Sequence, residues 1–401
     1  MLDFDVAQSR LATAANAPAQ SEDVSLADCI GRVLATPIVA TLDLPSADNS
    51  AMDGYAIRFA DYQPDVRFPI QQRCYAGDTP QALQPGNAIR LFTGSIMPEG
   101  ADTVIMQENA REENDEVLFL EAPEKGRHVR YRGEDVRQGT EIVPRGAVLD
   151  AAHVALIASQ GIDQVSVFPL LKVGLLTTGN ELVAPGQPRA PEQIYNSNGP
   201  MLTALLRRQG VQSVKALHAD DNPESITRAF ETLLAECDLV LTVGGVSVGE
   251  KDLVKPTIEQ LGATLDMWRV NMKPGKPVAL AHARNKPIVC LPGNPVSAFV
   301  VYALLVSPLV RTMQGRTQVL PAIQYGTLDA DREFSGSRIS FLRAQAHFDK
   351  NALPRLIPHG DQGSAIISSL AWADVLARIP ANTTTRKDDV VAFYDLAHWL
   401  R

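Results

Sequence analysis

The sequence predicts a multidomain α/β protein in which a three-layer α/β/α domain accompanies β-rich N-terminal domains and a C-terminal β-barrel. Three observations support this fold class. Apolar strands and amphipathic helices alternate strictly across residues 166–318. Short apolar runs separated by Gly, Pro and Asn turns fill residues 22–165, and a similar β-like texture returns after Pro321. The 401 residues suffice for about two to three domains.

Helices are predicted at both ends of the N-terminal β-rich region. Residues 1–17 predict a short amphipathic helix, with Asp3 or Asp5 near its start. Helical spacing returns only at residues 151–160, which predict a second helix. The region between them is expected to consist of short strands and turns.

Strands and helices follow one another in residues 166–318. The predicted strands are VFPLLKVGLLTTG, VQSVKALHA, CDLVLTV and IVCLPG, and the helices are expected near 199–209, after an Asp221 cap, at 252–260 and at 295–313. This order predicts a parallel sheet with helices on both faces. Ligands of such sheets bind at the carboxyl ends of the strands, so the segments that follow the strands are candidate site residues.

Composition and charge exclude several classes of protein. Hydrophobic residues make up 45% and charged residues 21%, as in ordinary globular proteins. The net charge of −9 argues against nucleic acid or an acidic membrane surface as a partner. No run approaches the ~18 apolar residues of a membrane span, and the acidic start MLDFDVAQSR lacks the apolar segment of a secretory signal. A cytoplasmic location is therefore expected.

Cysteine and histidine patterns give no metal-binding or disulfide signature. Cys29, Cys74, Cys237 and Cys290 are scattered without a CxxC pair, and the seven histidines form no HxH or HExxH group. A zinc ribbon, a disulfide framework and a His/Cys transition-metal site are therefore not expected.

Three carboxylates follow three of the predicted strands. These are Glu181, Asp221 and Asp252. Like charges at one crevice repel one another unless a cation is bound, and an all-oxygen donor set suits Mg²⁺. For Asp221 or Asp252 taken alone, a helix N-cap is the preferred interpretation. Their equivalent positions after neighbouring strands favour a shared metal site.

Glycine-rich and lysine-rich segments predict anion contacts at the same edge. The loop GGVSVG lets backbone N–H groups approach an anion, although a tight turn without ligand is equally consistent with it. Its candidate contacts are Gly244, Gly245, Ser247 and Gly249. KPGKP places Lys273 and Lys276 around a Pro-Gly bend, an arrangement that suits a tetrahedral oxyanion; the alternative is a solvated turn.

The N-terminal part contains a second kind of signal. Residues 48–56, DNSAMDGYA, do not alternate as a strand should, which favours a loop retained for function. A strand-to-turn step follows at Thr93. The segment RHVRYRGEDV gathers arginines beside Asp135, and an exposed mixed-charge surface is its preferred interpretation.

Seven motifs then occur together in a characteristic order. They are SAMDGYA, RLFTGSIMP, RGEDV, TTGNEL, GGVSVGEKD, KPGKP and LPGNPVS. The set closely resembles the molybdopterin molybdenumtransferase family, which is related to the E domain of gephyrin, over nearly the whole chain. The resemblance implies a linker domain (22–45 and 140–165), an inserted domain (46–139), a molybdopterin-binding α/β domain (1–21 and 166–318) and a C-terminal β-barrel (319–401).

The resemblance also implies an activity and an assembly. The family inserts molybdate into adenylylated molybdopterin with Mg²⁺, releasing AMP and forming the molybdenum cofactor. Its members are elongated homodimers in which the α/β domain of one chain meets the N-terminal part of the other. The adenylyltransferase that supplies the activated pterin is a candidate partner.

Matching motif positions carry the family's residue roles onto this chain. Catalytic roles fall on Asp53, Thr93, Asp135, Glu181, Asp221 and Asp252, the last three also as metal ligands. Substrate contacts fall on the loop residues 244, 245, 247 and 249, on Lys273 and Lys276, and on Pro292 and Pro295. Asn180 stands where the family often has Asp, and TGSIMP replaces the commoner TGAPxP. If Asn180 replaces a metal ligand, the metal site is weaker than usual.

Three alternatives stay open at this point. The adenylyltransferase itself resembles only residues 166–318, so SAMDGYA and the C-terminal part argue against it. A scaffold role, as in gephyrin, has no support in this chain. Tungstate cannot be separated from molybdate, because both are tetrahedral dianions of similar size. No Ser/His/Asp or Cys/His arrangement supports covalent catalysis.

Overall fold

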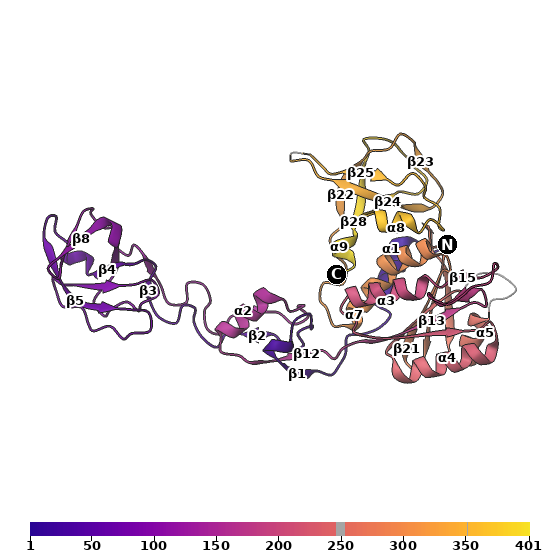
Figure 1. Ribbon diagram of the computed structural model, residues 1–401, viewed down its shortest axis with the longest axis horizontal. Coiled ribbons are helices and arrows are strands. Elements are labelled where there is room, and N and C mark those ends of the chain that lie inside the picture. The colour runs from indigo at the N-terminus through magenta and orange to yellow at the C-terminus, as the bar shows by residue number, and fades with distance from the viewer. Residues whose placement is uncertain (246–252, 351) are drawn as a thin grey trace. The chain divides into compact units, whose positions relative to one another are not determined.

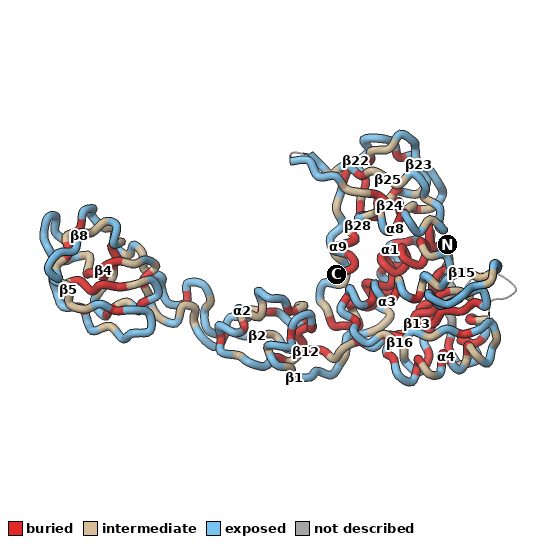
Figure 2. The backbone as a smooth tube through the Cα atoms, in the orientation of Figure 1, coloured by how far each residue is buried: buried red, intermediate tan, exposed pale blue. Residues whose placement is uncertain are grey.

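The computed structural model describes residues 1–245, 253–350 and 352–401. They form two compact units. Unit 1 comprises Met1–Thr36, Arg145–Ala151 and Gln164–Arg401, and unit 2 comprises Pro37–Pro144 and Ala152–Asp163. Figure 2 shows the buried residues concentrated in the sheet of unit 1 and in the helices beside it. The boundaries of the four domains stay a prediction.

A six-stranded sheet with the order β16-β13-β17-β21-β20-β18 forms the centre of unit 1. Its strands are β13 (Lys172–Thr178), β16 (Ser213–Ala219), β17 (Leu239–Val243), β18 (Thr264–Arg269), β20 (Pro277–Ala283) and β21 (Lys286–Leu291). The first four in spatial order are parallel, as predicted. Strand β20 runs antiparallel to both of its neighbours, β21 and β18, so the prediction of a wholly parallel sheet was wrong at this end.

The antiparallel pairing of β20 and β21 has a local cause. Only Arg284 and Asn285 connect the two strands, and both have positive φ, 52° and 61°. Two such residues form a tight hairpin turn, which reverses the chain and fixes antiparallel pairing. A parallel connection needs a crossover of a dozen or more residues.

Helices cover both faces of this sheet (Figure 1). One core cluster joins a sheet face to α1 (Phe4–Ala12), α3 (Asn198–Arg208), α6 (Pro295–Val301) and α7 (Ser307–Met313). The other joins the opposite face to α4 (Pro223–Glu236) and α5 (Val254–Gln260). Leu175 and Leu176 are successive residues of β13 that belong to different clusters, as strand alternation requires. The three-layer α/β/α prediction is confirmed.

The first helix is shorter than predicted. Asp3 caps α1, because its Oδ1 accepts hydrogen bonds from Asp5 N at 2.9 Å and Val6 N at 3.3 Å. The helix ends at Ala12 rather than at residue 17. At Thr13 the hydroxyl donates back to the Ser9 carbonyl at 2.9 Å, a local bond at the end of the helix. Helix α2 (Ala151–Ser159) lies where the sequence predicts it.

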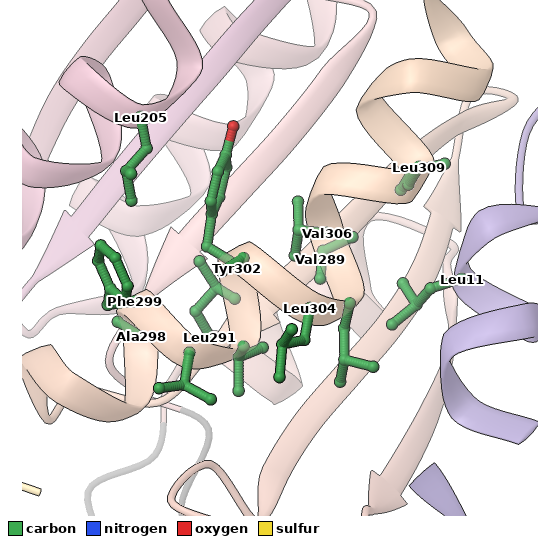
Figure 3. Packing of buried hydrophobic residues seen from close by; sticks show 14 of the residues in the cluster. Leu11, Leu205, Val289, Leu291, Ala298, Phe299, Tyr302, Leu304, Val306 and Leu309 are labelled. Atoms are coloured by element: carbon green, nitrogen blue, oxygen red, sulfur yellow. The ribbon is translucent and has the colours of Figure 1, made fainter. Parts of the chain in front are cut away.

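The helix from Pro295 to Met313 corrects the sequence-based statement about apolar runs. Helices α6 and α7, joined by the π-helical turn Tyr302–Val306, form one 19-residue helix whose apolar window has a mean hydropathy of 1.7. By length and composition alone it could cross a membrane, but 89% of that window is buried inside the protein. Figure 3 shows its side chains packed among Leu11, Leu205 and Val289. Burial on all sides explains its composition.

The C-terminal part of unit 1 is a closed barrel, as predicted. Its strands are β22 (Gln324–Leu328), β24 (Ile339–His347), β25 (Arg355–Pro358), β26 (Val375–Ile379) and β28 (Val390–Asp395), with β23 (Phe334–Ser335) and β27 (Thr384–Thr385) pairing separately. Pairing of β24 with β26 closes the barrel. Short helices α8 (Ser368–Trp372) and α9 (Leu396–Trp399) follow β25 and β28.

One strand of the barrel sheet comes from the α/β region. Strand β19 (Met272–Lys273) pairs in parallel with β24 at Ile339 and Ser340. The segment that begins KPGKP is therefore attached to the barrel by backbone pairing as well as by chain connectivity.

The N-terminal region is β-rich, as predicted. Unit 2 contains a six-stranded sheet of β7 (Thr103–Met106), β4 (Gly54–Ile57), β6 (Ala88–Leu91), β5 (Arg67–Cys74), β9 (Glu116–Phe119) and β8 (Ala110–Glu113). Two short pairs accompany it: β3 (Asn49–Ser50) with β10 (Val129–Arg130), and β2 (Ile38–Val39) with β11 (Glu141–Val143). In unit 1, β1 (Glu22–Ser25) pairs with β12 (Gln164–Val167).

Candidate functional site

The strand registers bring the predicted segments of unit 1 to one edge of its sheet. Thr178, the last residue of β13, pairs with Ala219 at the end of β16. The ends of β17 and β21 are paired in the same way, through Val243 and Leu291. The loop KPGKP reaches this edge for a different reason from the one predicted, because β20 runs antiparallel and therefore begins where its neighbours end.

Asp221 is not the cap of α4, which corrects the sequence-based preference. Asn222 caps the helix, with its Oδ1 accepting from Ser225 N at 2.8 Å. Asp221 instead accepts a hydrogen bond from Asn180 N on Oδ2 at 3.2 Å, and its own N–H donates to Asn180 Oδ1 at 3.0 Å. The Asp221 carboxylate therefore does not cap α4, and its role as a metal ligand stays a prediction. Asn180 joins the loops that follow β13 and β16.

Glu181 holds an exposed carboxylate directly over Gly179. A Cβ at Gly179 would lie 2.6 Å from Glu181 Oε2, and its φ of +145° also favours glycine. The chain then leaves the sheet through β14 (Leu182–Val183) and returns through β15 (Ile194–Tyr195). Gly179 is thus the residue that gives the Glu181 side chain its room beside the strand end.

Two asparagines join the segment between β13 and α3 to the sheet edge. Neither of them was identified from the sequence. Asn196 Nδ2 donates to Thr177 Oγ1 at 2.9 Å, at the end of β13. Asn198 Nδ2 donates to the Gly293 carbonyl at 2.7 Å, within the LPGNP turn. Both asparagines lie in the segment NSNGP that opens α3, a cluster of turn-forming residues that is the available sequence signal.

The third carboxylate, Asp252, lies outside the described residues, together with Ser247 and Gly249. Gly244 and Gly245 follow β17 at φ of +96° and +66°. Across the described ranges, no group of three or more His, Cys, Asp or Glu residues is placed to hold a metal ion. Glu181 and Asp221 supply carboxylate oxygens from loops that follow neighbouring strands, which is the donor chemistry that Mg²⁺ prefers. The three-carboxylate site stays a prediction.

A cavity of about 840 Å³ adjoins KPGKP and the barrel. Its cationic lining residues are Lys273, Lys276, Arg332, Arg338 and Arg343, and its acidic ones are Glu333 and Asp361. Glu333 already accepts from Arg386 Nε at 2.8 Å. The excess of positive charge suits an anionic ligand.

Backbone contacts hold the KPGKP loop in place, so it is more than a solvated turn. Arg338 Nη1 donates to the Met272 carbonyl at 3.1 Å. Gly275 has a φ of +102°, and a Cβ there would lie 2.5 Å from Cγ2 of the buried Val301. Pro274 and Gly275 are buried whereas Lys273 and Lys276 are exposed. The bend packs against α6 and leaves both ammonium groups at the cavity.

Asp53 and Thr93 form a clasp in unit 2. Asp53 Oδ1 accepts hydrogen bonds from Thr93 N at 2.7 Å and from Thr93 Oγ1 at 2.9 Å. The residues meet because Gly54 of β4 pairs with Leu91 of β6. These two hydrogen bonds favour the charged carboxylate and hold the pKa of Asp53 below its usual value.

Asp135 lies in another part of unit 2. Its backbone N–H donates to the Leu44 carbonyl at 3.0 Å, and its side chain is exposed. Arg132, from the same segment, donates from Nε to Asp43 Oδ2 at 2.6 Å. One arginine of this segment, Arg132, is therefore paired with a carboxylate, as expected for a mixed-charge surface.

Comparisons with known proteins cover almost the whole chain. Residues 2–161 match the MoeA N-terminal region (domain I and II), residues 174–312 a probable molybdopterin binding domain, and residues 325–396 the MoeA C-terminal region (domain IV). The molybdopterin molybdenumtransferase of Haemophilus influenzae is 35% identical over 372 residues, 92% of each chain. That of Nostoc sp. is 35% identical over 91% of this chain and 86% of its own.

The chain belongs to the molybdopterin molybdenumtransferase family.

Solved structures agree with this assignment. The molybdopterin biosynthesis MoeA protein from Pyrococcus horikoshii OT3 has a TM-score of 0.83 at 27% identity, covering 98% of this chain and 99% of its own. The molybdopterin molybdenumtransferase fold therefore extends through both units and the C-terminal barrel, as the motifs predict.

The barrel side of the cavity contains two arginines that the motifs did not indicate. Arg343 is 1% exposed, and its guanidinium donates from Nε to Ser369 Oγ and from Nη2 to the Gly363 carbonyl, both at 3.0 Å. Burial lowers the pKa of Arg343. Arg338 also lines the cavity. No local pattern marks these residues, since closure of the barrel brings them together.

The prolines of LPGNP occupy structural positions. Pro292 is buried in the turn, and Pro295 is the first residue of α6, where its fixed φ suits a helix start. Beside them, Asn294 Nδ2 donates to Ser364 Oγ at 3.2 Å, and Ser364 lines the cavity. The turn thus connects the sheet edge to the barrel.

Replacing Thr93 by Val should raise the pKa of Asp53 toward its ordinary value of about 3.9. Valine removes the hydroxyl donor and keeps the backbone donor, so part of the depression should persist. Stability from this clasp is present above the ordinary pKa and is lost as pH falls through the lowered pKa. NMR titration of the Asp53 carboxyl measures the change. Asp43, whose pKa is also lowered but by Gln138 and Arg132, is the internal control; an unmoved Asp53 pKa contradicts the clasp.

Proposed function

We propose that this protein inserts molybdate into adenylylated molybdopterin, releasing AMP and forming the molybdenum cofactor. The observation that carries the proposal is the cation-lined cavity built around KPGKP, in a chain whose relatives are named molybdopterin molybdenumtransferase. The cavity lies next to the sheet edge of unit 1. The same unit contains residues 174–312, which match a probable molybdopterin binding domain.

Lys273 and Lys276 are the proposed molybdate-binding residues. Their ammonium groups flank a buried bend, and Arg338 adds a third cation that is anchored to the Met272 carbonyl. A donor that is held in place before a dianion binds stabilises it without reorganisation, and Arg338 is such a donor. The lining residues Ser297 and Ser364 supply neutral hydroxyl donors.

Glu181, Asp221 and Asp252 are the proposed ligands of Mg²⁺, which supplies neutralisation of phosphate charge when bound. Glycine-rich residues 244, 245, 247 and 249 are proposed to bind the phosphates through backbone N–H groups and the serine hydroxyl. The chain's own contribution is positioning and charge neutralisation, without a covalent enzyme intermediate. Breaking the pyrophosphate bond of the adenylylated pterin releases AMP.

The proposed active enzyme is a cytoplasmic homodimer. Asp53 and Thr93 belong to unit 2, and the carboxylate and lysine loops belong to unit 1. We propose that each active site combines unit 1 of one chain with unit 2 of its partner, with Asp135 contributing from unit 2. The adenylyltransferase that supplies the activated pterin is a proposed further partner.

Reconstitution with purified components tests the function. The full-length protein is incubated with adenylylated molybdopterin, Mg²⁺ and either molybdate or tungstate, and AMP is measured. AMP release that needs the protein, Mg²⁺ and an oxyanion is expected. Protein that binds the adenylylated pterin but releases no AMP under any of these conditions contradicts the proposal. Comparing the two oxyanions decides the metal preference.

Lys273→Ala and Lys276→Ala should each raise the molybdate concentration for half-maximal AMP release by roughly 10- to 150-fold. A charge-assisted hydrogen bond contributes about 1.5–3 kcal/mol, and about 1.4 kcal/mol corresponds to tenfold. Lys215→Ala is the matched control. Lys215 Nζ pairs with Glu236 Oε2 at 2.6 Å, and neither residue lines the cavity. If all three variants keep the wild-type molybdate dependence, KPGKP has no role in oxyanion binding.

A further inference from the structure

Four side chains form a stacked column in unit 2. The guanidinium of Arg90 lies over the ring of Tyr55 at 4.8 Å and over the ring of Phe92 at 5.0 Å. Phe92 in turn stacks on Tyr75, with ring centroids 4.5 Å apart and planes within 7° of parallel. The column therefore runs from Tyr55 through Arg90 and Phe92 to Tyr75.

The strand registers explain this column. Tyr55 of β4 faces Arg90 of β6 across an antiparallel pair, and Phe92 follows Arg90 by two residues on the same side. Strand β5 runs parallel to β6 with Cys74 opposite Leu91, so Tyr75 leaves its strand beside Phe92. Tertiary pairing of three strands, rather than any local motif, assembles the stack.

One end of the column is fixed and the other is open. Tyr55 is 4% exposed, and its hydroxyl donates to Glu112 Oε2 at 2.6 Å. Arg90 is 8% exposed and donates to Gln107 Oε1. Tyr75 is 55% exposed. The buried end holds the exposed ring in a defined orientation, which an isolated surface tyrosine lacks.

The open end lies at the same edge of the sheet as the clasp between Asp53 and Thr93. Thr93 directly follows Phe92, and Asp53 lies two residues before Tyr55. The turns after β5 and β6 also touch each other, since Ser95 Oγ donates to the Cys74 carbonyl at 2.8 Å. A ligand group held at Asp53 and Thr93 would thus have an oriented aromatic ring close by.

We propose that Tyr75 is a stacking platform for a flat heteroaromatic ring of the substrate. This inference rests on the proposed function, whose substrate carries two such rings, a pterin and an adenine. A preorganised aromatic face binds a flat ring without first ordering its own side chain. The exposed rim of the stack is a tyrosine, which combines an apolar face with a hydroxyl that tolerates water.

Kinetics of three variants test the proposal. Tyr75→Ala should raise the KM for adenylylated molybdopterin by roughly 5- to 150-fold, the range for loss of one ring-stacking contact, with kcat changed much less. Tyr75→Phe keeps the ring and should restore the wild-type KM. Tyr325→Ala removes a tyrosine that is 59% exposed in the barrel and should behave as wild type. An unchanged KM in folded Tyr75→Ala overturns the proposal.

Competition distinguishes the two rings. AMP and 6-hydroxymethylpterin are used separately as inhibitors of the wild type and of Tyr75→Ala. If adenine stacks on Tyr75, Tyr75→Ala should raise only the inhibition constant of AMP. If the pterin stacks there, Tyr75→Ala should raise only the inhibition constant of 6-hydroxymethylpterin. Equal inhibition constants in both proteins for both compounds overturn the proposal.

A binding measurement separates this proposal from the proposed function. Tyr75→Trp in the full-length protein places a fluorophore at the open end of the column, and quenching by AMP or by 6-hydroxymethylpterin is recorded. Saturable quenching without AMP release in the reconstitution would support the platform and reject the proposed function. AMP release without quenching by either compound would support the function and reject the platform. Tyr325→Trp is the control for non-specific quenching.

Discussion

Glu181→Gln should abolish Mg²⁺-dependent AMP release while leaving the fold intact. The amide has nearly the same shape and fits the same space over Gly179. It removes the negative charge beside the Asp221 loop, so a divalent cation loses one of its proposed carboxylate ligands. AMP release is measured across a range of Mg²⁺ concentrations, and thermal unfolding reports on the fold.

The excursion that follows Glu181 supplies a matched control. Glu192 is another exposed carboxylate on the same excursion, and none of the motifs includes it. Glu192→Gln should keep wild-type activity and wild-type Mg²⁺ dependence. If Glu181→Gln behaves in the same way, Glu181 is not a ligand of the reaction's cation and the shared-metal hypothesis fails.

Mixing two inactive variants should restore about a quarter of wild-type activity. Asp53→Ala disables unit 2 and Glu181→Ala disables unit 1 of its own chain. In a two-fold symmetric dimer with shared sites, a mixed dimer has one site with both changes and one site with neither. Random reassortment makes about half of the dimers mixed, and half of their sites are intact. AMP release after co-expression measures the recovery.

A second pair of variants checks the logic of this experiment. Asp53→Ala and Thr93→Ala both lie in the clasp of unit 2, so their mixture should restore nothing, because every site contains one altered clasp. Differently tagged chains allow the mixed dimers to be isolated. If isolated dimers of Asp53→Ala with Glu181→Ala are inactive, the two residues serve a site within one chain.

The α/β region was largely predictable because its signals are local. Strand hydrophobicity, helix starts and the polar segments after the strands all lie within a few neighbouring residues. The antiparallel end of the sheet was missed because its direction depends on two residues, Arg284 and Asn285, in a turn that was not recognised as a hairpin. The choice of Asn222 over Asp221 as cap depends on backbone angles that neighbouring cap residues do not reveal.

The remaining site features depend on contacts between distant segments. Asp53 and Thr93 are 40 residues apart and meet only through the β4–β6 register. Arg338 and Arg343 reach the cavity because the barrel closes, an event that local sequence does not record. The apolar helix from Pro295 to Met313 was underestimated because Ser297, Ser307 and Arg311 interrupt its run of apolar residues, while its mean hydropathy over the whole window stays high.

The pairing of β19 with β24 limits how the protein can be divided into independent modules. Met272 and Lys273 belong to the α/β segment by chain order, yet their backbone partners Ile339 and Ser340 belong to the barrel. A fragment that stops before the barrel would keep both lysines but would lose the strand that holds the first of them. Exchanging the C-terminal barrel between relatives would therefore also change the strand that positions Lys273. We expect these two parts of the chain to evolve together.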